Sequence, residues 1–150
     1  MAVARDRPYV QFNFVVDWGA GPTDGPSAGF QEVSGLESSV DVIEYRNGNH
    51  KLNAPIKLTG LNRVADVCLR RGLAGVLDLY QWFDDIRNGN VKALRTVTIS
   101  LMSEDHGAVV LQWKLLNARI IKHTCGPLNA RGQQVAIEEI VLACERLELE

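Results

Sequence analysis

The sequence has few of the features that mark an enzyme, a metalloprotein or a membrane protein. It holds three cysteines, an odd number, and no two are spaced as Cys-x-x-Cys, so neither a disulfide framework nor a zinc site is indicated. Its apolar runs are only a few residues long, whereas a membrane-spanning helix needs about 20. Dinucleotide-binding, Walker, HExxH and GxSxG motifs are absent. We therefore expect no membrane anchor, no metal and no cofactor.

An excess of charge of one sign is also lacking. Lys and Arg number 16 and Asp and Glu number 18, so the formal net charge is −2. Nucleic-acid binding needs a concentrated positive field, and this balance gives no support for one. The N-terminus, Met1 to Arg7, carries charges but no apolar segment behind them, which predicts no secretory signal peptide. We expect a chain made in the cytoplasm.

The composition and the length are typical of one globular domain. Of the 150 residues, 46% are hydrophobic and 23% charged, and a chain of this length builds a core without disulfides. One stretch has the composition of a linker: Gly19 to Gly29, with four glycines and two prolines in eleven residues. It is too short to separate two domains, so we expect a single domain over residues 1–150 with a loop at this point.

Apolar and polar residues alternate along most of the chain, which predicts half-buried β-strands. The segments with this pattern are residues 10–18, 40–46, 64–71, 96–101, 109–115 and 133–149. His106-Gly107 predicts a hairpin turn between residues 96–101 and 109–115. In Gln133 to Leu149 the apolar phase shifts, which predicts a bulge or a middle section covered on both faces.

One segment breaks the alternation and predicts a helix. From Val76 to Arg87 the apolar residues recur with helical spacing, and Asn88-Gly89 follows as a stop signal. Asp78 in the first turn and Arg87 in the last suit the helix dipole. The patterns together predict a mainly antiparallel β protein with one helix.

The titratable residues do not form a catalytic set in the sequence. Asp84-Asp85 occupy adjacent helix positions, and Glu138-Glu139 point to opposite faces of a strand, so neither pair shares a site. We expect solvated or interface charge for both pairs. His50, His106 and His123 are isolated, and a metal site would need further ligands beside them. The sequence therefore does not favour an enzyme.

Two polar features carry more information. The segment Glu44 to Leu58 joins two apolar strands through the turn pair Asn47-Gly48, and a loop this long is usually functional or disordered. The second feature is the polar side of the predicted strands, which is either the solvent side of a sandwich or the lining of a water-filled channel in an oligomer. Its residues are Gln11, Asn13, Thr96, Thr98, Ser100, Gln112 and Lys114.

A series of short motifs runs in order along nearly the whole chain. They are Pro8-Tyr9 with Phe12-Asn13-Phe14, Gly29 to Leu36, Glu44 to Asn49, Lys57 to Leu61, Val67 to Gly72, Leu79 to Trp82, Trp113 to Ala118, Pro127 to Ala130, and Val135 to Glu139 leading into Leu142 to Arg146. Singly each has low specificity. In this order the chain resembles the phage tail tube protein family, which also supplies the inner tubes of phage-tail-like contractile injection systems.

The resemblance implies two packed antiparallel β-sheets, sandwich-like or barrel-like, with one flanking helix and an extended hairpin loop. It also implies a structural role without catalysis, in which six subunits close into a ring and rings stack into a hollow tube. A contractile sheath drives such a tube through a target envelope. The implied partners are further copies of the chain, a sheath protein, baseplate or hub proteins, and cargo or DNA in the lumen. The chain would then end up in a phage tail or injection-system particle, with possible release outside the cell.

Carried onto this sequence, the resemblance assigns three sets of residues. The loop that reaches the neighbouring ring is Tyr45, Arg46, Asn47, Gly48, Asn49, His50, Lys51, Leu52 and Asn53. The polar strand residues named above become candidates for the lumen. The helix residues Asp78, Gln81, Asp84 and Asp85 become candidates for the outer, sheath-facing surface.

Two other interpretations stay open at this point. Within the same class, the chain is a specialised paralogue that starts the tube at the baseplate and is rare in each particle. In a different class, it is a monomeric β-sandwich that binds a small ligand, which requires a closed apolar pocket and a stable monomer.

Overall fold

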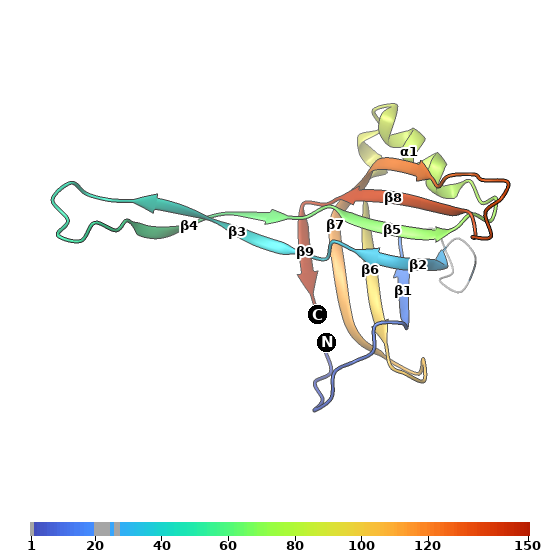
Figure 1. The fold of residues 1–150 in the computed structure, drawn as a ribbon, viewed down its shortest axis with the longest axis horizontal. Coiled ribbons are helices and arrows are strands. Elements are labelled where there is room, and N and C mark those ends of the chain that lie inside the picture. Colours follow the sequence, from blue (N-terminus) through green and yellow to red (C-terminus); the bar gives the residue numbers. More distant parts are fainter. Residues whose placement is uncertain (1, 20–24, 26–27) are drawn as a thin grey trace.

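The computed structural model describes residues 2–19, 25 and 28–150, which form a two-sheet body with a long arm (Figure 1). The described strands are β1 (Phe14–Asp17), β2 (Phe30–Ser34), β3 (Ser38–Tyr45), β4 (Ile56–Val64), β5 (Val67–Gly72), β6 (Arg95–Met102), β7 (Val109–Cys125), β8 (Ile137–Ala143) and β9 (Arg146–Leu149). They are joined by the helix α1 (Asp78–Arg87) and the 3-10 turn η2 (Val91–Ala93). The expected fold class, mainly antiparallel β with one α-helix in the described part, is confirmed.

One long strand, β7, belongs to both sheets of the body. Its first half lies between β6 and β9, and β6 pairs in turn with β1; we term these four strands the first sheet. Its second half pairs with β8, and the order continues through β5 to β2 as the second sheet. Between the halves, Asn117 adopts a left-handed φ of 53°, a conformation that asparagine tolerates better than most residues.

The hairpin expected around His106-Gly107 is confirmed, because β6 and β7 pair in antiparallel register on either side of it. His106 has a φ of 59°, and the backbone N–H of Gly107 donates to a carboxylate oxygen of Asp105 at 2.9 Å. This carboxylate also accepts a hydrogen bond from Ser103, which helps to hold the pKa of Asp105 below its usual value.

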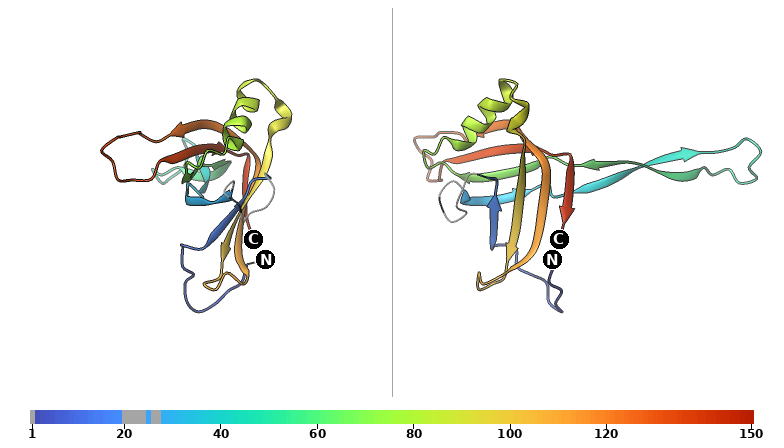
Figure 2. Two further views of the ribbon diagram at one scale, coloured as in Figure 1. Left: turned by 90° about the vertical axis from the view of Figure 1, so that its right-hand side faces the viewer. Right: turned by 180° about the vertical axis from the view of Figure 1, so that it is seen from behind.

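Strands β3 and β4 pair only with each other and leave the body as a two-stranded arm (Figures 1 and 2). The arm continues the β2–β5 ladder after a short break. At that break Gly35 has a φ of +86°, and a Cβ atom there would lie 2.2 Å from the carbonyl oxygen of Asp66. Both observations require glycine, so Gly35 fixes the point at which the arm leaves the body.

The two sheets and α1 enclose an apolar core with two tryptophans at its centre. Trp18 and Trp82 stack with ring centroids 5.6 Å apart, and the Arg95 guanidinium lies 5.1 and 4.9 Å from the two centroids. The indole N–H of Trp82 donates to the carbonyl oxygen of Ala93 at 2.7 Å. The other buried members of this core are Val16, Val67, Leu69, Leu79, Val97, Ile99, Leu115, Ala118, Ile120, Ile140 and Leu142.

The predicted helix is confirmed, but it begins two residues later than Val76. Gly75 adopts a φ of +78°, and the carbonyl oxygen of Val76 accepts a hydrogen bond from the side chain of Arg71 at 3.2 Å. Val76 and Leu77 therefore belong to the turn that leads into α1. Within the helix, Leu79 and Trp82 are buried.

Two predicted strands differ from the observed ones. The strand expected from residue 10 to 18 begins only at Phe14, because the chain bends at residues 11–12 and leaves Phe12 exposed. The segment expected as one strand from Gln133 to Leu149 is divided into β8 and β9. Between them the N–H of Glu145 donates to the carbonyl oxygen of Leu116 at 3.0 Å, where the chain passes from one half of β7 to the other. The shift in apolar phase thus marks a change of sheet.

The loop expected from Gly19 to Gly29 falls mostly outside the described residues. Two observed strands, β2 and β4, are not among the predicted segments.

Substitution of Gly35 by alanine should destabilise the protein by about 1–3 kcal/mol, because alanine would adopt a left-handed φ and its Cβ would meet the Asp66 carbonyl. Urea denaturation followed by circular dichroism measures the free energy of unfolding. Gly48→Ala is the matched control, since no atom lies within 4 Å of its added Cβ. Equal midpoints for the two variants would contradict the role given to Gly35.

Candidate functional site

The end of the arm is a defined loop. The nine residues assigned to the ring-stacking loop, Tyr45 to Asn53, comprise the last residue of β3 and most of the turn to β4, and all are exposed. The Arg46 side chain donates to the carbonyl oxygens of His50 and Leu52, both at 3.2 Å. The hydroxyl of Tyr45 bonds to the side-chain oxygen of Asn47. These hydrogen bonds all lie within the loop itself.

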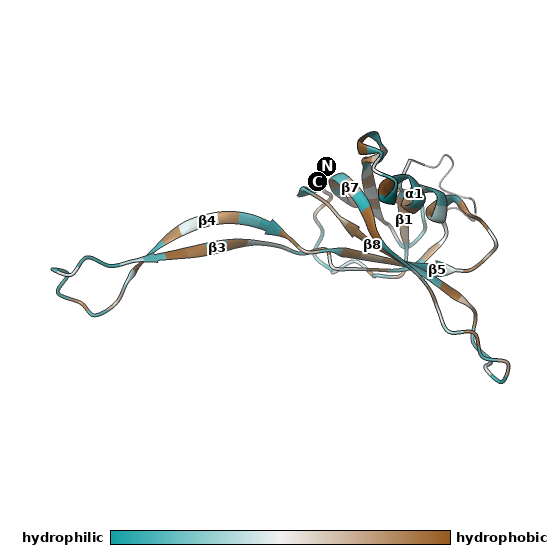
Figure 3. Cartoon of the chain, turned by 90° about the horizontal axis from the view of Figure 1, so that it is seen from above, coloured by the Kyte–Doolittle hydropathy of each residue, from teal (hydrophilic) through white to brown (hydrophobic). Residues whose placement is uncertain are grey.

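One side of the arm is apolar and half exposed. In the β3–β4 register Ile43 lies opposite Leu58, and Tyr45 lies opposite Ile56. Cross-strand partners point to the same side of a hairpin, so these four residues form one patch, which we term the apolar arm face. Their exposed fractions are 54%, 49%, 53% and 50%. Figure 3 shows this apolar character in the strands of the arm, well away from the body.

Four of the seven predicted lumen residues share one face of the first sheet. Thr98 lies opposite Lys114, and Ser100 lies opposite Gln112, across β6 and β7. The amide of Gln112 donates to the Ser100 hydroxyl at 3.2 Å. Together they border a shallow hollow of about 430 Å³ on the side of the sheet that faces away from the core. Thr96 precedes them on the same strand and is exposed.

Gln11 and Asn13 are not part of that face, because β1 starts only after them. Asn13 is 7% exposed, and its side-chain amide donates to the carbonyl oxygens of Ser103 and Glu104 at 3.5 and 3.3 Å. Its role in the subunit is therefore to tie the N-terminal segment to the β6–β7 turn. Gln11 is exposed and borders a separate hollow beside β2.

Sequence reasoning missed three acidic residues on the same face as Lys114. Asp17 lies opposite Thr98, and Glu148 lies opposite Lys114. Glu150 accepts a hydrogen bond from the Lys114 ammonium group at 3.1 Å. Charged residues alternate with leucines at the C-terminus, and this pattern could have revealed the acidic residues. It does not show which side of β9 lies on the polar face, because that depends on the pairing of β9 with β7.

The four helix residues predicted for the outer surface do not all point outward. Gln81 and Asp85 are exposed, and Asp84 pairs with Arg87 one turn later at 2.6 Å. Asp78 instead turns toward the body, where its carboxylate lies 2.6 Å from the Arg71 guanidinium. Of these four residues, Gln81 and Asp85 thus lie on the exposed surface of α1.

A buried charged network ties α1 to the second sheet. Arg71 is 2% exposed and bonds to Glu138 at 2.9 Å as well as to Asp78. The other carboxylate oxygen of Glu138 lies 2.7 Å from Nε2 of His123, whose ring stacks on Phe83 of α1. Burial lowers the pKa of Arg71, but hydrogen bonds to the two carboxylates and their charges outweigh burial, so its pKa lies above the usual value.

The burial of Glu138 corrects the expectation that both members of the Glu138-Glu139 pair carry solvated or interface charge. Its neighbour Glu139 points to the opposite side of β8, as expected, and pairs with Arg70 at 3.5 Å on the more exposed side. Arg71 could not be recognised as the partner of Glu138 from sequence, because the two are 67 residues apart and meet only through the β5–β8 register.

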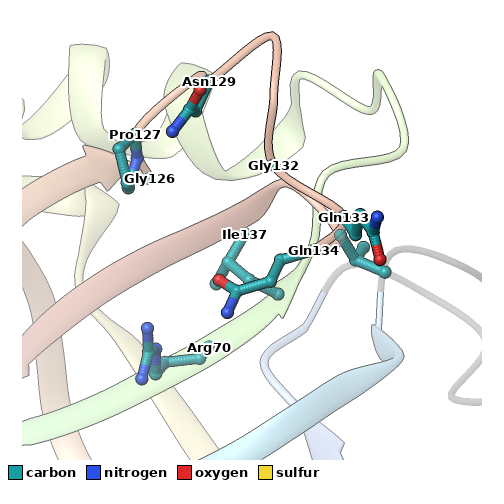
Figure 4. A pocket seen from close by; sticks show the side chains of 9 residues that line it. Arg70, Gly126, Pro127, Asn129, Gly132, Gln133, Gln134 and Ile137 are labelled. Atoms are coloured by element: carbon teal, nitrogen blue, oxygen red, sulfur yellow. The ribbon is translucent and has the colours of Figure 1, made fainter.

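The hollows in the described surface are shallow and open to solvent. The one at the β7–β8 loop measures about 390 Å³ and is bordered by Asn129, Gln133 and Gln134 of that loop and by Arg70 of β5 (Figure 4). Arg70 is already engaged by Glu32 and Glu139. Among the described residues no group of three His, Cys, Asp or Glu side chains is placed to hold a metal ion. None of the described helices has the length and apolarity needed to cross a membrane.

Comparison with known proteins assigns the family. The model of the T4-like virus tail tube protein gp19 family matches residues 10–148. The chain belongs to this family of tail tube proteins, as its motifs indicated. A search of the curated proteins found no match.

Solved structures agree with this assignment. A chain in the PVC sheath-tube complex of an extracellular contractile injection system, in the extended state, has a TM-score of 0.83 and 27% identity, with 97% of this chain and 93% of that chain covered. A chain in the PVC sheath/tube terminator has a TM-score of 0.83 and 28% identity, covering 98% and 99%. Hcp1 from Flavobacterium johnsoniae, at 12% identity and a TM-score of 0.55 over 92% and 94%, shares the fold.

Replacing Glu138 by alanine should lower the free energy of unfolding by about 3–5 kcal/mol, because Arg71 would lose one of its buried partners. The adjacent Glu139→Ala is the control and should cost no more than about 1 kcal/mol, since its ion pair is partly solvated. Thermal and urea unfolding of both variants measure the difference. Similar losses from the two would show that the buried network adds no stability.

Proposed function

We propose that this chain is the building block of the inner tube of a contractile tail or injection system. Six copies close into a ring, rings stack into a hollow tube, and cargo or DNA passes through the lumen. The chain acts by assembly and has no catalytic role. The observation that carries the proposal is the arm. Its apolar face and its polar end loop are exposed and lie away from the body.

An isolated two-stranded hairpin is marginally stable in water, and its apolar residues gain little while they stay exposed. The apolar arm face is about half exposed in the single chain. Contact with a neighbouring copy would bury this surface and stabilise the arm. The loop at its end, Tyr45 to Asn53, would then reach the neighbouring ring.

The first sheet supports ring closure. It ends at β1 on one side and at β9 on the other, and open strand edges pair readily with further strands. Gln112 and Glu150 exchange backbone hydrogen bonds at 2.9 and 2.8 Å, so the N–H of Leu149 points away from β7 toward the open side. We infer that β9 of one copy pairs with β1 of the next. This contact can repeat from copy to copy until the ring closes, and no strand edge of the first sheet is then left open.

In such a ring the polar face of the first sheet would line the lumen. Thr98, Ser100, Gln112 and Lys114 would then face the passing cargo together with Asp17 and Glu148. A hydrated lining with mixed charges offers cargo few apolar contacts. The structurally similar chains described as parts of a sheath-tube complex and of a tube terminator support a sheath as the outer partner. Gln81 and Asp85 on α1 are the residues we assign to that contact.

The baseplate-starting paralogue is distinguished from the main tube subunit by abundance. Quantitative mass spectrometry of purified particles should find this chain at a copy number comparable with that of the sheath protein. A copy number of about one ring per particle would instead assign it to the baseplate.

Negative-stain electron microscopy of the concentrated protein should show rings or hollow rods, and absence of the chain from whole particles would contradict the proposal.

Deletion of Asn47 to Asn53 should leave the fold intact but abolish stacking, because it removes the loop that reaches the next ring and leaves the body untouched. Circular dichroism checks the fold, and electron microscopy counts rings and rods. Asn49→Ala, a single change in the same exposed loop, is the control. Rods of normal length from the deletion variant would refute the loop assignment.

Substitution of Leu149 by proline should block ring closure, because proline lacks the backbone N–H that β9 would offer to the next copy. Leu149→Ala keeps that N–H and should still form rings. Mass photometry at increasing concentration measures the assembly state, and unfolding curves check that the monomer is equally stable. Rings formed by the proline variant would show that closure uses another edge.

A further inference from the structure

Basic residues outnumber acidic ones at the far end of the arm. Residues 45–65 carry four basic residues and no acidic one. Arg63, near the body, has an acidic partner within the arm at 2.6 Å. Arg46, Lys51 and Lys57, near the far end, form no ion pair with any described residue, although Glu44 lies opposite Lys57 in the β3–β4 register. We term these three residues the basic arm end.

The opposite end of the arm carries two acidic residues, Glu37 and Asp66. They flank the break between the β2–β5 and β3–β4 ladders, where the N–H of Ala65 donates to the carbonyl oxygen of Glu37 at 3.0 Å. Both side chains are exposed, and neither forms an ion pair with any described residue. We term them the acidic arm root.

The basic arm end and the acidic arm root are too far apart to meet within one chain. Strand β3 has eight residues from Ser38 to Tyr45, and the seven steps between them span about 23 Å at the rise of a strand. At physiological ionic strength the screening length is about 8 Å, so the two ends hardly attract each other. Between them lies the apolar arm face, which also has no cover. A partner for all three features must come from outside the chain.

We propose that the basic arm end of one copy docks on the acidic arm root of the next copy, head to tail, with the apolar arm face covered in the same contact. The inference rests on the proposed function and names the surface that receives the arm. A second copy is the partner that satisfies both ends, because each chain offers one basic end and one acidic root. Such a contact is heterologous, so it repeats from copy to copy as a ring or stack requires.

The two kinds of contact have different tasks in this arrangement. Exposed ion pairs contribute little affinity but speed association and exclude wrong registers. Removal of the apolar arm face from water contributes the larger share of the affinity. Assembly should therefore slow in high salt, while assembled tubes persist.

Charge reversal at both ends tests the pairing. Lys51→Glu with Lys57→Glu makes an acidic arm end, and Glu37→Lys with Asp66→Lys makes a basic root. Either double variant alone should lose tubes in electron microscopy, because like charges meet. A mixture of the two variants should recover tubes. The two kinds of chain can then alternate, so that each arm end meets an arm root of opposite charge. Lys92→Glu with Lys122→Glu, on the body, changes the net charge equally and should still assemble.

The outcomes separate this inference from the proposed function. If wild-type tubes form and the arm-end variant forms them equally well, the head-to-tail pairing is wrong while the tube role stands. Zero-length carbodiimide cross-linking of mixed heavy- and light-isotope chains gives a second measurement, expected to join Lys51 or Lys57 of one copy to Glu37 or Asp66 of another. Wild-type chains that form neither tubes nor such cross-links would overturn both. Circular dichroism confirms that each variant folds.

Discussion

The rest of the structure depends on β7, which pairs across both sheets. Its first half holds β6 and β9 and its second half holds β8, so the bend at Asn117 sets the angle between the two layers. The core fills the space that this bend encloses, with Trp18 from the end of β1 stacked on Trp82 from α1. A shift in the β7 register would displace both sheets at once, because each is paired to the same backbone.

The charged network around Arg71 fixes α1 to this frame. Arg71 of β5, Glu138 of β8 and His123 of β7 come from three adjacent strands, and Asp78 brings in the start of the helix. Buried charges are tolerated only when paired, so the network permits one placement of α1 over the second sheet. The network thus fixes the helix on the body, whereas the open sheet edges and the arm have no comparable partners in the described part of the chain.

Three features of the chain are left without partners among its described residues, and all three favour assembly with further copies. The first sheet stops at two open edges, the arm exposes apolar residues along one side, and its unpaired charges lie at opposite ends. Each is unfavourable or unused in a single molecule, and in the proposed tube each would be met by another copy. A protein that binds a small ligand would instead need an enclosed apolar cavity, whereas the proposed assembly of this tail tube protein would use surfaces of this kind.

The sequence by itself determined most of the strands of the body, the hairpin at His106-Gly107, the helix ending before Asn88 and the family, because these follow from periodicity, turn residues and motif order along the chain. It did not determine where long strands divide, since the break between β8 and β9 depends on which half of β7 each one meets. Nor did it place Asn13 or Asp78, whose polar side chains are turned inward by partners far away in sequence. Only the tertiary structure decided these, because burial and pairing depend on contacts between distant segments.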